Sequence, residues 1–280
     1  MNTLEIKDLT KSYKSFQLGP VNLTLPSGCI MGLIGENGAG KSTTIKLILD
    51  MIEKENGTIR IFEKDNQKGL SKTKEDIGVV LNEPGYPECI RAGQLGRIMK
   101  YTYKQWDDKV FSELVKKLKI PEDTDFKDLS SGNKMKLGIA AAMSHHAKLL
   151  ILDEATNGLD PVAREDVLDM LYEFTRDEAH SILISSHIVS DLEKLCDYIA
   201  FIHNGKILLC EEKDRLLEKY GVIRCSEEEL KRVDNEAVKG KKSTPYGIEA
   251  VVDRKKIPKD MEIGTVSIED LFIFMIKGER

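Results

Sequence analysis

Short, continuously apolar runs recur along the chain, and segments with helical periodicity lie between them. Four of these runs have the length and composition of strands that are buried on both faces; they are CIMGLI (29–34), IGVVL (77–81), LLILD (149–153) and SILIS (181–185). One helical pattern runs from about Ser42 to Met51, and another runs from Pro161, a residue that suits a first turn, toward Glu178. Strands that alternate with helices favour an α/β domain with a largely parallel sheet.

Other patterns surround these alternating elements. Residues 3–9 alternate like a half-buried strand, and residues 21–25 predict a second short one. Residues 91–143 lack strand signals and predict helices that break at Pro121, which indicates an inserted helical subdomain at about 88–145. Asn204-Gly205, between YIAFIH and KILL, predicts a β-hairpin.

The pattern changes after about Tyr220. Ser226–Glu229 and Ser267–Asp270 both resemble capping boxes, and strand-like runs lie at 248–252 and 262–266. We therefore expect a main domain at 1–220 and a small α+β accessory domain at 221–280. The apolar run at 271–275 is expected to pack against the main domain, with exposure for a partner as the alternative.

Composition narrows the possible functions. The chain has 280 residues, 41% of them hydrophobic, and a net charge of -5, so it lacks the basic excess of a nucleic-acid-binding surface. The N-terminus has no apolar run like that of a secretion signal, and the longest apolar runs fall short of the ~20 residues that span a bilayer. If the protein works at a membrane, another chain must cross it.

Cysteine and histidine positions do not predict a metal centre. The five cysteines are scattered, without metal or redox spacing. We expect the adjacent His145 and His146 to close a helix, where positive charge suits the dipole, rather than to bind a metal.

Residues 35–42, GENGAGKS, match the phosphate-binding loop G-x-x-x-x-G-K-[ST]. The motif follows a buried strand and opens a helix, where backbone N–H groups and the helix dipole favour an anion. We expect Lys41 to reach the β- and γ-phosphate oxygens of a bound nucleotide and the Ser42 hydroxyl to ligate Mg²⁺. A glycine-rich turn without a ligand is the alternative. The predicted nucleotide-binding residues of this loop are Gly35, Glu36, Asn37, Gly38, Ala39, Gly40, Lys41, Ser42 and Thr43.

Three polar residues at strand ends are candidates for the chemistry. Asp153 and Glu154 end the apolar run LLILDE, at the sheet edge beside the phosphate loop. Asp153 would hold Mg²⁺, and Glu154 would orient or deprotonate an attacking water. His187, in SSH at the end of another buried strand, could contact the γ-phosphate and help to hold that water. Two solvated acids and a structural histidine are the alternatives.

Together these pieces resemble the ATP-binding cassette (ABC) family over residues 3–215. The family order is an aromatic residue near the start, the phosphate loop, a glutamine-type loop, a signature, a carboxylate strand, a second loop and a histidine; here the last five read NEPGYP, LSSGN, LLILDE, NGLD and SSH. The resemblance implies a P-loop NTPase core with an antiparallel β subdomain, an inserted helical subdomain and a small C-terminal α+β appendage. It also implies an ATPase that uses ATP and Mg²⁺.

NEPGYP (82–87), the aromatic stretch YTYKQW (101–106) and the tail LFIFMIKG (271–278) are similar to stand-alone ATPase subunits of bacterial ABC-2-type exporters. That similarity implies a separate ABC-2-type membrane permease as the partner, which the loop 82–90 and the helices after it would contact. It also implies a cytoplasmic location on the inner face of the membrane. The aromatic stretch could be another contact with the permease, but we expect it to belong mainly to the subdomain core.

The family likeness further implies a head-to-tail dimer, with itself or with a paralogous cassette, in which each ATP lies between the phosphate loop of one chain and the signature of the other. Ser130, Ser131 and Gly132, at the start of a helix running to about Met143, would then grip the γ-phosphate. Asp160 would contact the partner chain near its phosphate loop. From the residues alone, Ser130 and Asp160 are also sufficient as ordinary helix caps.

Some positions depart from the family pattern. Ser131 and Asn133 stand where glycine and glutamine are usual, and Asn82, followed by Glu83, stands in place of the glutamine. Asparagine is one methylene shorter, which favours a water-bridged contact of Asn82 with Mg²⁺ over a direct one. Tyr13 would stack on adenine, with Phe16 as the second candidate and a strand-surface tyrosine as the alternative.

Two other function classes compete with the transporter subunit. A soluble cassette that acts on DNA or the ribosome is one, but the interval between Lys41 and Asp153 has no room for a long coiled coil, and the chain holds one cassette. A regulatory nucleotide-binding module with little turnover is the other, and Glu154 argues against it.

Overall fold

A six-stranded sheet forms the centre of the computed structural model, which describes residues 1–68, 73–82, 84–245 and 247–278. The strand order is β10-β9-β3-β8-β7-β6, and all strands except β10 run parallel. The strands are β3 (Ile30–Ile34), β6 (Ile77–Val80), β7 (Leu149–Asp153), β8 (Ser181–Ser186), β9 (Tyr198–His203) and β10 (Lys206–Glu212). Every residue of β3, β7 and β8 is buried, which confirms the strands predicted from continuous apolar runs.

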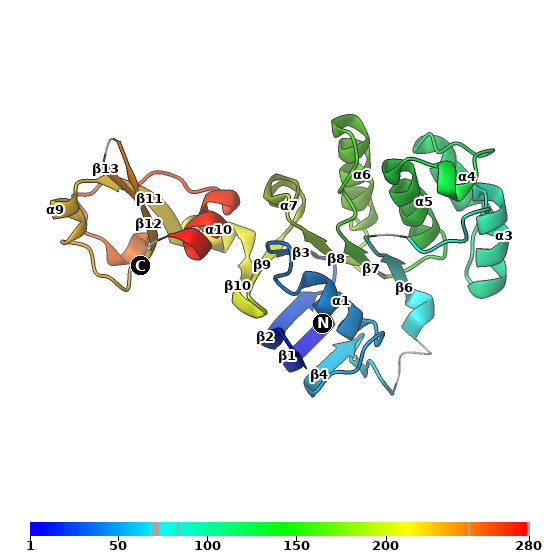
Figure 1. Ribbon diagram of the computed structural model, residues 1–280, viewed down its shortest axis with the longest axis horizontal. Coiled ribbons are helices and arrows are strands. Elements are labelled where there is room, and N and C mark those ends of the chain that lie inside the picture. The colour runs from blue at the N-terminus through cyan, green and yellow to red at the C-terminus, as the bar shows by residue number, and fades with distance from the viewer. Residues whose placement is uncertain (69–72, 83, 246, 279–280) are drawn as a thin grey trace.

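Helices follow three of the parallel strands and cover the sheet (Figure 1). They are α1 (Lys41–Ile48), α6 (Pro161–Phe174) and α7 (Val189–Leu195). The first two end earlier than the sequence predicted. After α1, Asp50 adopts a left-handed conformation with φ 55°, and after α6 the Thr175 hydroxyl donates to the Tyr172 carbonyl in a closing turn.

A second, antiparallel sheet has the order β2-β1-β4-β5 and lies below α1 in Figure 1. Its strands are β1 (Asn2–Tyr13), β2 (Phe16–Pro26), β4 (Asn56–Ile61) and β5 (Lys64–Asp65). The first two are longer than the sequence predicted, and the last two were not predicted. A cluster of buried side chains that includes Leu4, Met31 and Ile45 joins this sheet to α1 and the central sheet.

The region between β6 and β7 is helical, as predicted, and lies at the right of Figure 1. It contains α3 (Ala92–Thr102), α4 (Asp108–Lys117), the 3₁₀ turn η2 (Phe126–Asp128) and α5 (Ser131–Met143), and the 3₁₀ turn η1 (Lys74–Asp76) precedes β6. Glycines let α5 approach β6 closely. A Cβ on Gly78 would lie 2.5 Å from the Ala142 carbonyl oxygen, and one on Gly138 would lie 3.2 Å from Val80 Cγ1.

His145 corrects one expectation about the end of α5. Its side chain is buried and stacks on Tyr103 with ring centroids 3.9 Å apart. Burial lowers the pKa of His145 to about 4, so the imidazole is neutral near pH 7 and gives the helix end no positive charge. The expected charge–dipole role is therefore wrong for His145, because tertiary packing covers the ring.

The C-terminal part holds a three-stranded antiparallel sheet of order β11-β13-β12, at the left of Figure 1. Its elements are α8 (Lys213–Lys219), β11 (Tyr220–Cys225), α9 (Glu227–Leu230), β12 (Val238–Thr244), β13 (Gly247–Asp253), η3 (Arg254–Lys256) and α10 (Ile268–Lys277). The run 248–252 lies in β13, but 262–266 is wrong as a strand, because it makes a single bridge between Gly264 and Val222.

The capping signals of this part differ in outcome. Ser226 and Glu229 form the predicted capping box. Ser267 accepts from the Asp270 backbone N–H, but the Asp270 carboxylate accepts from the Ser267 hydroxyl instead of the Ser267 backbone N–H. Only half of the second box is therefore formed.

Helix α10 lies between the three-stranded sheet and the central sheet (Figure 1). Leu271 and Phe274 belong to the main hydrophobic core, and the Phe272 ring packs edge-on against Phe201 of β9 at 5.0 Å. The packing expected for 271–275 is thus confirmed. Because this core continues into β13, the domain boundary near residue 220 stays a prediction.

Candidate functional site

The phosphate-binding motif forms the turn between β3 and α1 and lines a cavity. The residues around the cavity are Phe16, Glu36, Asn37, Gly38, Gly40, Lys41, Ser42, Thr43, Asn82 and Glu154. Gly40 has φ 114°, and a Cβ there would lie 2.8 Å from Leu18 Cδ1, so the turn requires glycine at this position.

The predicted β9–β10 hairpin contacts the phosphate loop. Asn204 and Gly205 have φ 46° and 75°, as a tight hairpin turn requires. The Gly205 backbone N–H donates to the Ala39 carbonyl at 2.9 Å, and the Gly205 carbonyl accepts from Gly19. One backbone hydrogen bond therefore joins the hairpin to the loop, and a second joins it to β2.

Lys41 is buried and makes three polar contacts through its ammonium group. It donates to the carbonyls of Gly35 at 2.7 Å and Glu36 at 3.2 Å, and it lies 3.1 Å from Glu154 Oε1. The carbonyls hold the side chain across its own loop. The ammonium group of Lys41 is thus paired with the Glu154 carboxylate within the cavity.

The three strand-end residues predicted for chemistry come together at the carboxyl edge of β7 and β8. The second oxygen of Glu154, Oε2, lies 2.7 Å from His187 Nδ1. Glu154 has φ 55°, a left-handed conformation that non-glycine residues seldom adopt. Asp153, one residue earlier, is buried beside it.

Sequence reasoning missed one residue of this edge, Ser185. Its hydroxyl donates to Asp153 Oδ1 at 2.6 Å, and both its hydroxyl and its carbonyl accept from the Glu154 backbone N–H at 3.1 Å. The motif SSH contains the residue, but only the pairing of Asp153 with Ser185 across β7 and β8 places it between the two acids.

Asn82 is shared by two cavities. It lines the phosphate-loop cavity and also a second one, whose other lining residues are Pro84, Tyr86, Glu88, Phe126, Lys127, Ser131 and Lys134. The Tyr86 ring packs edge-on against Phe126 at 5.5 Å, and burial raises the pKa of Tyr86 to about 12. Glu83, named with Asn82 in the sequence, lies outside the described residues.

Of the two aromatic candidates for adenine, Phe16 lines the phosphate-loop cavity and Tyr13 does not. Tyr13 is 47% exposed, and the Lys11 ammonium lies 5.8 Å from its ring centroid. The geometry favours Phe16 as the adenine contact, and the role of Tyr13 stays a prediction.

The signature residues and Asp160 cap helices. The Ser130 hydroxyl accepts from the Asn133 backbone N–H at the start of α5. Asp160 accepts from the N–H groups of Ala163 and Val162, and these hydrogen bonds hold its pKa below the usual range. Both cap interpretations are confirmed, and neither residue lines the phosphate-loop cavity of its own chain.

The start of α5 touches the loop before α6. A Cβ on Gly132 would lie 3.3 Å from the Gly158 carbonyl oxygen, and a Cβ on Gly158 would lie 3.1 Å from Ser131 Oγ. The signature and the NGLD loop therefore form one continuous surface. The structure does not bring the signature into the chain's own phosphate-loop cavity, whereas it does bring Lys41 and Glu154 together there.

The residues at the cavity suit Mg²⁺. Ser42, the second residue of α1, lines the cavity with an exposed side chain, and Asp153, buried one residue before the lining residue Glu154, supplies a carboxylate. Mg²⁺ prefers oxygen ligands and is usually held by one or two protein groups together with water and substrate phosphates. Among the described residues, no cluster of three or more histidines, cysteines or acids could hold a metal ion.

In the part of the chain that the structure describes, none of the helices is both long enough and apolar enough to span a bilayer.

Comparisons with known proteins point to one family. The family described as ABC transporter matches residues 18–157. The chain is 30% identical to the ABC transporter ATP-binding protein YtrB of Bacillus subtilis, over 99% of both chains. It is 37% identical to the lantibiotic transport ATP-binding protein SrtF of Streptococcus pyogenes, over 75% of this chain and 91% of SrtF.

A solved ATP-binding subunit of an ABC transporter is similar in fold, with a TM-score of 0.70 and 28% identity. The match covers 77% of this chain and 92% of that subunit. With the phosphate loop, the carboxylate strand and the histidine converging on one sheet edge, the chain belongs to the ABC transporter family, as an ATP-binding protein of the ABC ATPase type.

Proposed function

We propose that the chain is the ATP-hydrolysing subunit of a transporter, that it closes as a head-to-tail dimer around MgATP, and that it drives a separate membrane permease. One observation carries the proposal. Lys41 and Glu154 line the same cavity, whereas Ser130, the signature residue expected to bind the γ-phosphate, does not line it and caps helix α5. A second copy is therefore needed to bring a signature to the phosphates.

Within one chain, the residues divide the work of hydrolysis. Lys41 binds the β and γ oxygens, and Ser42 and Asp153 would hold Mg²⁺, which neutralises phosphate charge when bound. Glu154 takes a proton from the attacking water, and His187, 2.7 Å from Oε2, keeps the carboxylate oriented. Asn82 lines the same cavity and would contact the ion through a water molecule.

The partner copy contributes the start of α5. This helix has 13 residues, and its N-terminal N–H groups and dipole favour an anion. Gly132 has no Cβ to keep a phosphate away, and Ser130 offers a hydroxyl. Because the NGLD loop touches the same surface, Asp160 would meet the partner beside its phosphate loop.

Assembly and turnover test this part of the proposal together. Glu154→Gln should lower the ATPase rate by about 100-fold or more, because a general base contributes roughly that much. It should also form a dimer with MgATP in light scattering, because both phosphate grips persist. Ser130→Arg should stay monomeric and still bind ATP. A Glu154→Gln chain that stays monomeric at saturating MgATP would contradict the dimer.

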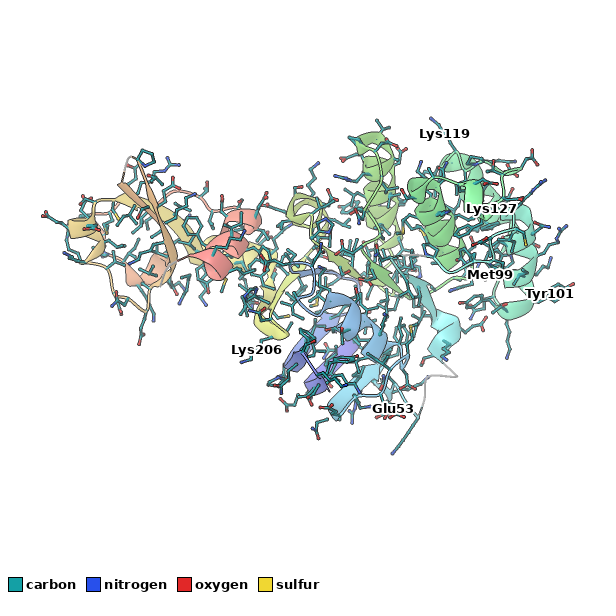
Figure 2. All side chains as sticks on the ribbon, viewed as in Figure 1. Glu53, Met99, Tyr101, Lys119, Lys127 and Lys206 are labelled. Atoms are coloured by element: carbon teal, nitrogen blue, oxygen red, sulfur yellow. The ribbon has the colours of Figure 1, made fainter. Side chains whose placement is uncertain are left out.

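The second cavity supports a permease contact. Asn82 lines both this cavity and the phosphate-loop cavity. Binding or loss of the γ-phosphate would therefore be transmitted through Asn82 to Pro84 and Tyr86. Tyr101, 93% exposed on α3, lies at the outer edge of the helical region, near Met99 in Figure 2. Ile98, three residues earlier on the same helix, is 49% exposed, so α3 offers an exposed apolar surface.

We propose that this surface docks on the cytoplasmic side of an ABC-2-type permease and that the cargo is exported. The name of SrtF, a lantibiotic transport protein, favours a peptide antibiotic as the cargo class. The tagged chain should co-purify with a polytopic membrane protein, and Tyr101→Glu should abolish this while leaving the ATPase rate of the isolated chain unchanged. Equal recovery of the membrane protein with Tyr101→Glu would contradict the docking surface.

A further inference from the structure

Strand β8 carries three buried serines that have different partners. Ser181, at the start of the strand, bonds to the Thr3 hydroxyl at 3.0 Å and accepts from the Gly28 backbone N–H. Ser186, at its end, accepts from the Ile188 backbone N–H at 2.9 Å. Only Ser185 contacts the two acidic residues of the candidate site.

The contacts of Ser185 use both capacities of its hydroxyl. A hydroxyl has one proton to donate and lone pairs with which to accept. The proton goes to Asp153 Oδ1 at 2.6 Å, a short, charge-assisted hydrogen bond. A lone pair accepts from the Glu154 backbone N–H, which the Ser185 carbonyl also approaches at 3.1 Å. One side chain thus holds an acidic side chain and the next residue's backbone.

The backbone that Ser185 holds is an unusual one. Glu154 has φ 55°, and a non-glycine residue keeps such a conformation only when its surroundings fix it. The paired acceptors on Ser185 are such a constraint, since the strand register sets Asp153 directly opposite Ser185. The Glu154 carboxylate is fixed separately, by Lys41 and His187.

We propose that Ser185 is a positioning residue for hydrolysis. Its hydroxyl orients the carboxylate that would hold Mg²⁺ and leaves Oδ2 of Asp153 for the ion and its water shell. Its two oxygens keep the backbone of Glu154 in the conformation that aims the base into the cavity. This inference rests on the roles proposed above for Asp153 and Glu154, and it adds a residue that acts only through them.

A buried serine could also serve stability alone, and Ser181 provides the matched control. Ser181 and Ser185 lie on the same strand, both are fully buried, and both bond through their hydroxyl to another side chain. Ser181 lies at the end of β8 opposite to the site. Alanine at either position removes the same atom, but only Ser185→Ala removes contacts to the acids.

The test measures metal binding as well as turnover. Mn²⁺ binding is followed by electron paramagnetic resonance in the presence of a non-hydrolysable ATP analogue, and the ATPase rate is measured against Mg²⁺ concentration. Removing an outer-shell partner of a metal ligand typically costs about 10–100-fold in metal affinity or activity. We expect a loss in that range for Ser185→Ala, less than about twofold for Ser181→Ala, and recovery in Ser185→Thr, which keeps the hydroxyl.

Several results would overturn the proposal. One is a Ser185→Ala protein that folds and keeps wild-type Mn²⁺ affinity and ATPase rate. Another is an equal loss in Ser181→Ala, which would mark a general effect of disturbing β8. If Ser185→Ala does not fold, Ser185→Cys, with a weaker donor of similar size, should show the same selective loss, and wild-type behaviour there counts against the idea.

The same experiment separates this inference from the proposed function. If the wild-type chain itself binds no Mn²⁺ with the ATP analogue and does not hydrolyse ATP, the proposed function fails and the role of Ser185 fails with it. If the wild type does both and Ser185→Ala matches it, only the positioning role is lost.

Discussion

The Nζ atom of Lys41 lies 3.1 Å from Oε1 of Glu154, and both side chains are buried. The cation expected to bind phosphate is therefore paired with the carboxylate expected to act as the base. A phosphate group that approaches Lys41 meets this carboxylate and must share or displace it. Lys41 also keeps two backbone carbonyl contacts, so the ammonium group stays in place when the carboxylate leaves.

This relationship predicts that Glu154 competes with nucleotide phosphates. In a Ser130→Arg background, which blocks dimer closure, Glu154→Gln should bind ADP and ATP several-fold more tightly, because a neutral amide neither holds Lys41 nor repels phosphate. Isothermal titration calorimetry at constant salt measures the change, with Ser130→Arg alone as the control. Unchanged or weaker binding in the double variant would show that the ion pair does not oppose phosphate.

Ser130 allows its cap role to be separated from its phosphate role. Ser130→Ala removes the acceptor for the Asn133 N–H and should cost about 1 kcal/mol of unfolding free energy. Ser130→Asp keeps a good N-cap and should retain that stability, but its charge would repel the partner's γ-phosphate and prevent the MgATP dimer. Urea unfolding and light scattering on the two variants check this. Dimerisation of Ser130→Asp at the wild-type MgATP concentration would leave Ser130 as a cap only.

Continuous apolar strands, the helix after the signature and the phosphate loop could be predicted well, because each of these is specified locally. The run LLILD gives β7 with its observed bounds, and Ser131–Met143 gives α5 with its observed bounds. Continuous burial on both faces leaves few alternatives for such strands. Lys41, Asp153, Glu154 and His187 could therefore be assigned to one sheet edge before the structure was known.

Elements that depend on distant partners could not be predicted. Strand β4 reads NGTIRI, in which only Ile59 and Ile61 are large and apolar, and it forms by pairing with β1. The contact of Ser185 with both acids follows from the register between β7 and β8, which no local pattern encodes. The choice of Phe16 over Tyr13 at the cavity depends on the turn that joins β1 to β2.

The buried His145 predicts acid sensitivity. Burial lowers its folded pKa from 6.5 to about 4, and the nearby Glu75, His146 and Asp76 modify that effect less than burial does. The unfolded chain therefore takes up the proton first, so stability is full above pH 6.5 and falls as the pH drops from 6.5 toward 4, by at most about 1.4 kcal/mol per unit.

His145→Leu should remove this part of the pH dependence, which urea unfolding at pH 7.5, 5.5 and 4.5 measures as a difference from wild type. His146→Gln is the control, because the His146 side chain is 55% exposed. If His145→Leu and wild type lose stability in parallel between pH 6.5 and 4.5, His145 is not the group responsible.

Helix α10 should be part of the cooperative core and not a loosely attached tail. Leu271 is fully buried in the main hydrophobic cluster, so Leu271→Ala should cost about 2–5 kcal/mol of unfolding free energy, because a cavity replaces packed methyl groups. Ile273, two residues along the same helix, is 42% exposed, and Ile273→Ala should change the free energy by only about 0.5 kcal/mol.

Urea unfolding followed by the fluorescence of Trp106, which lies in the helical region far from α10 in sequence, reports whether the loss reaches the whole chain. Equal, small effects of the two substitutions on that transition would mean that α10 unfolds separately from the ATP-binding core.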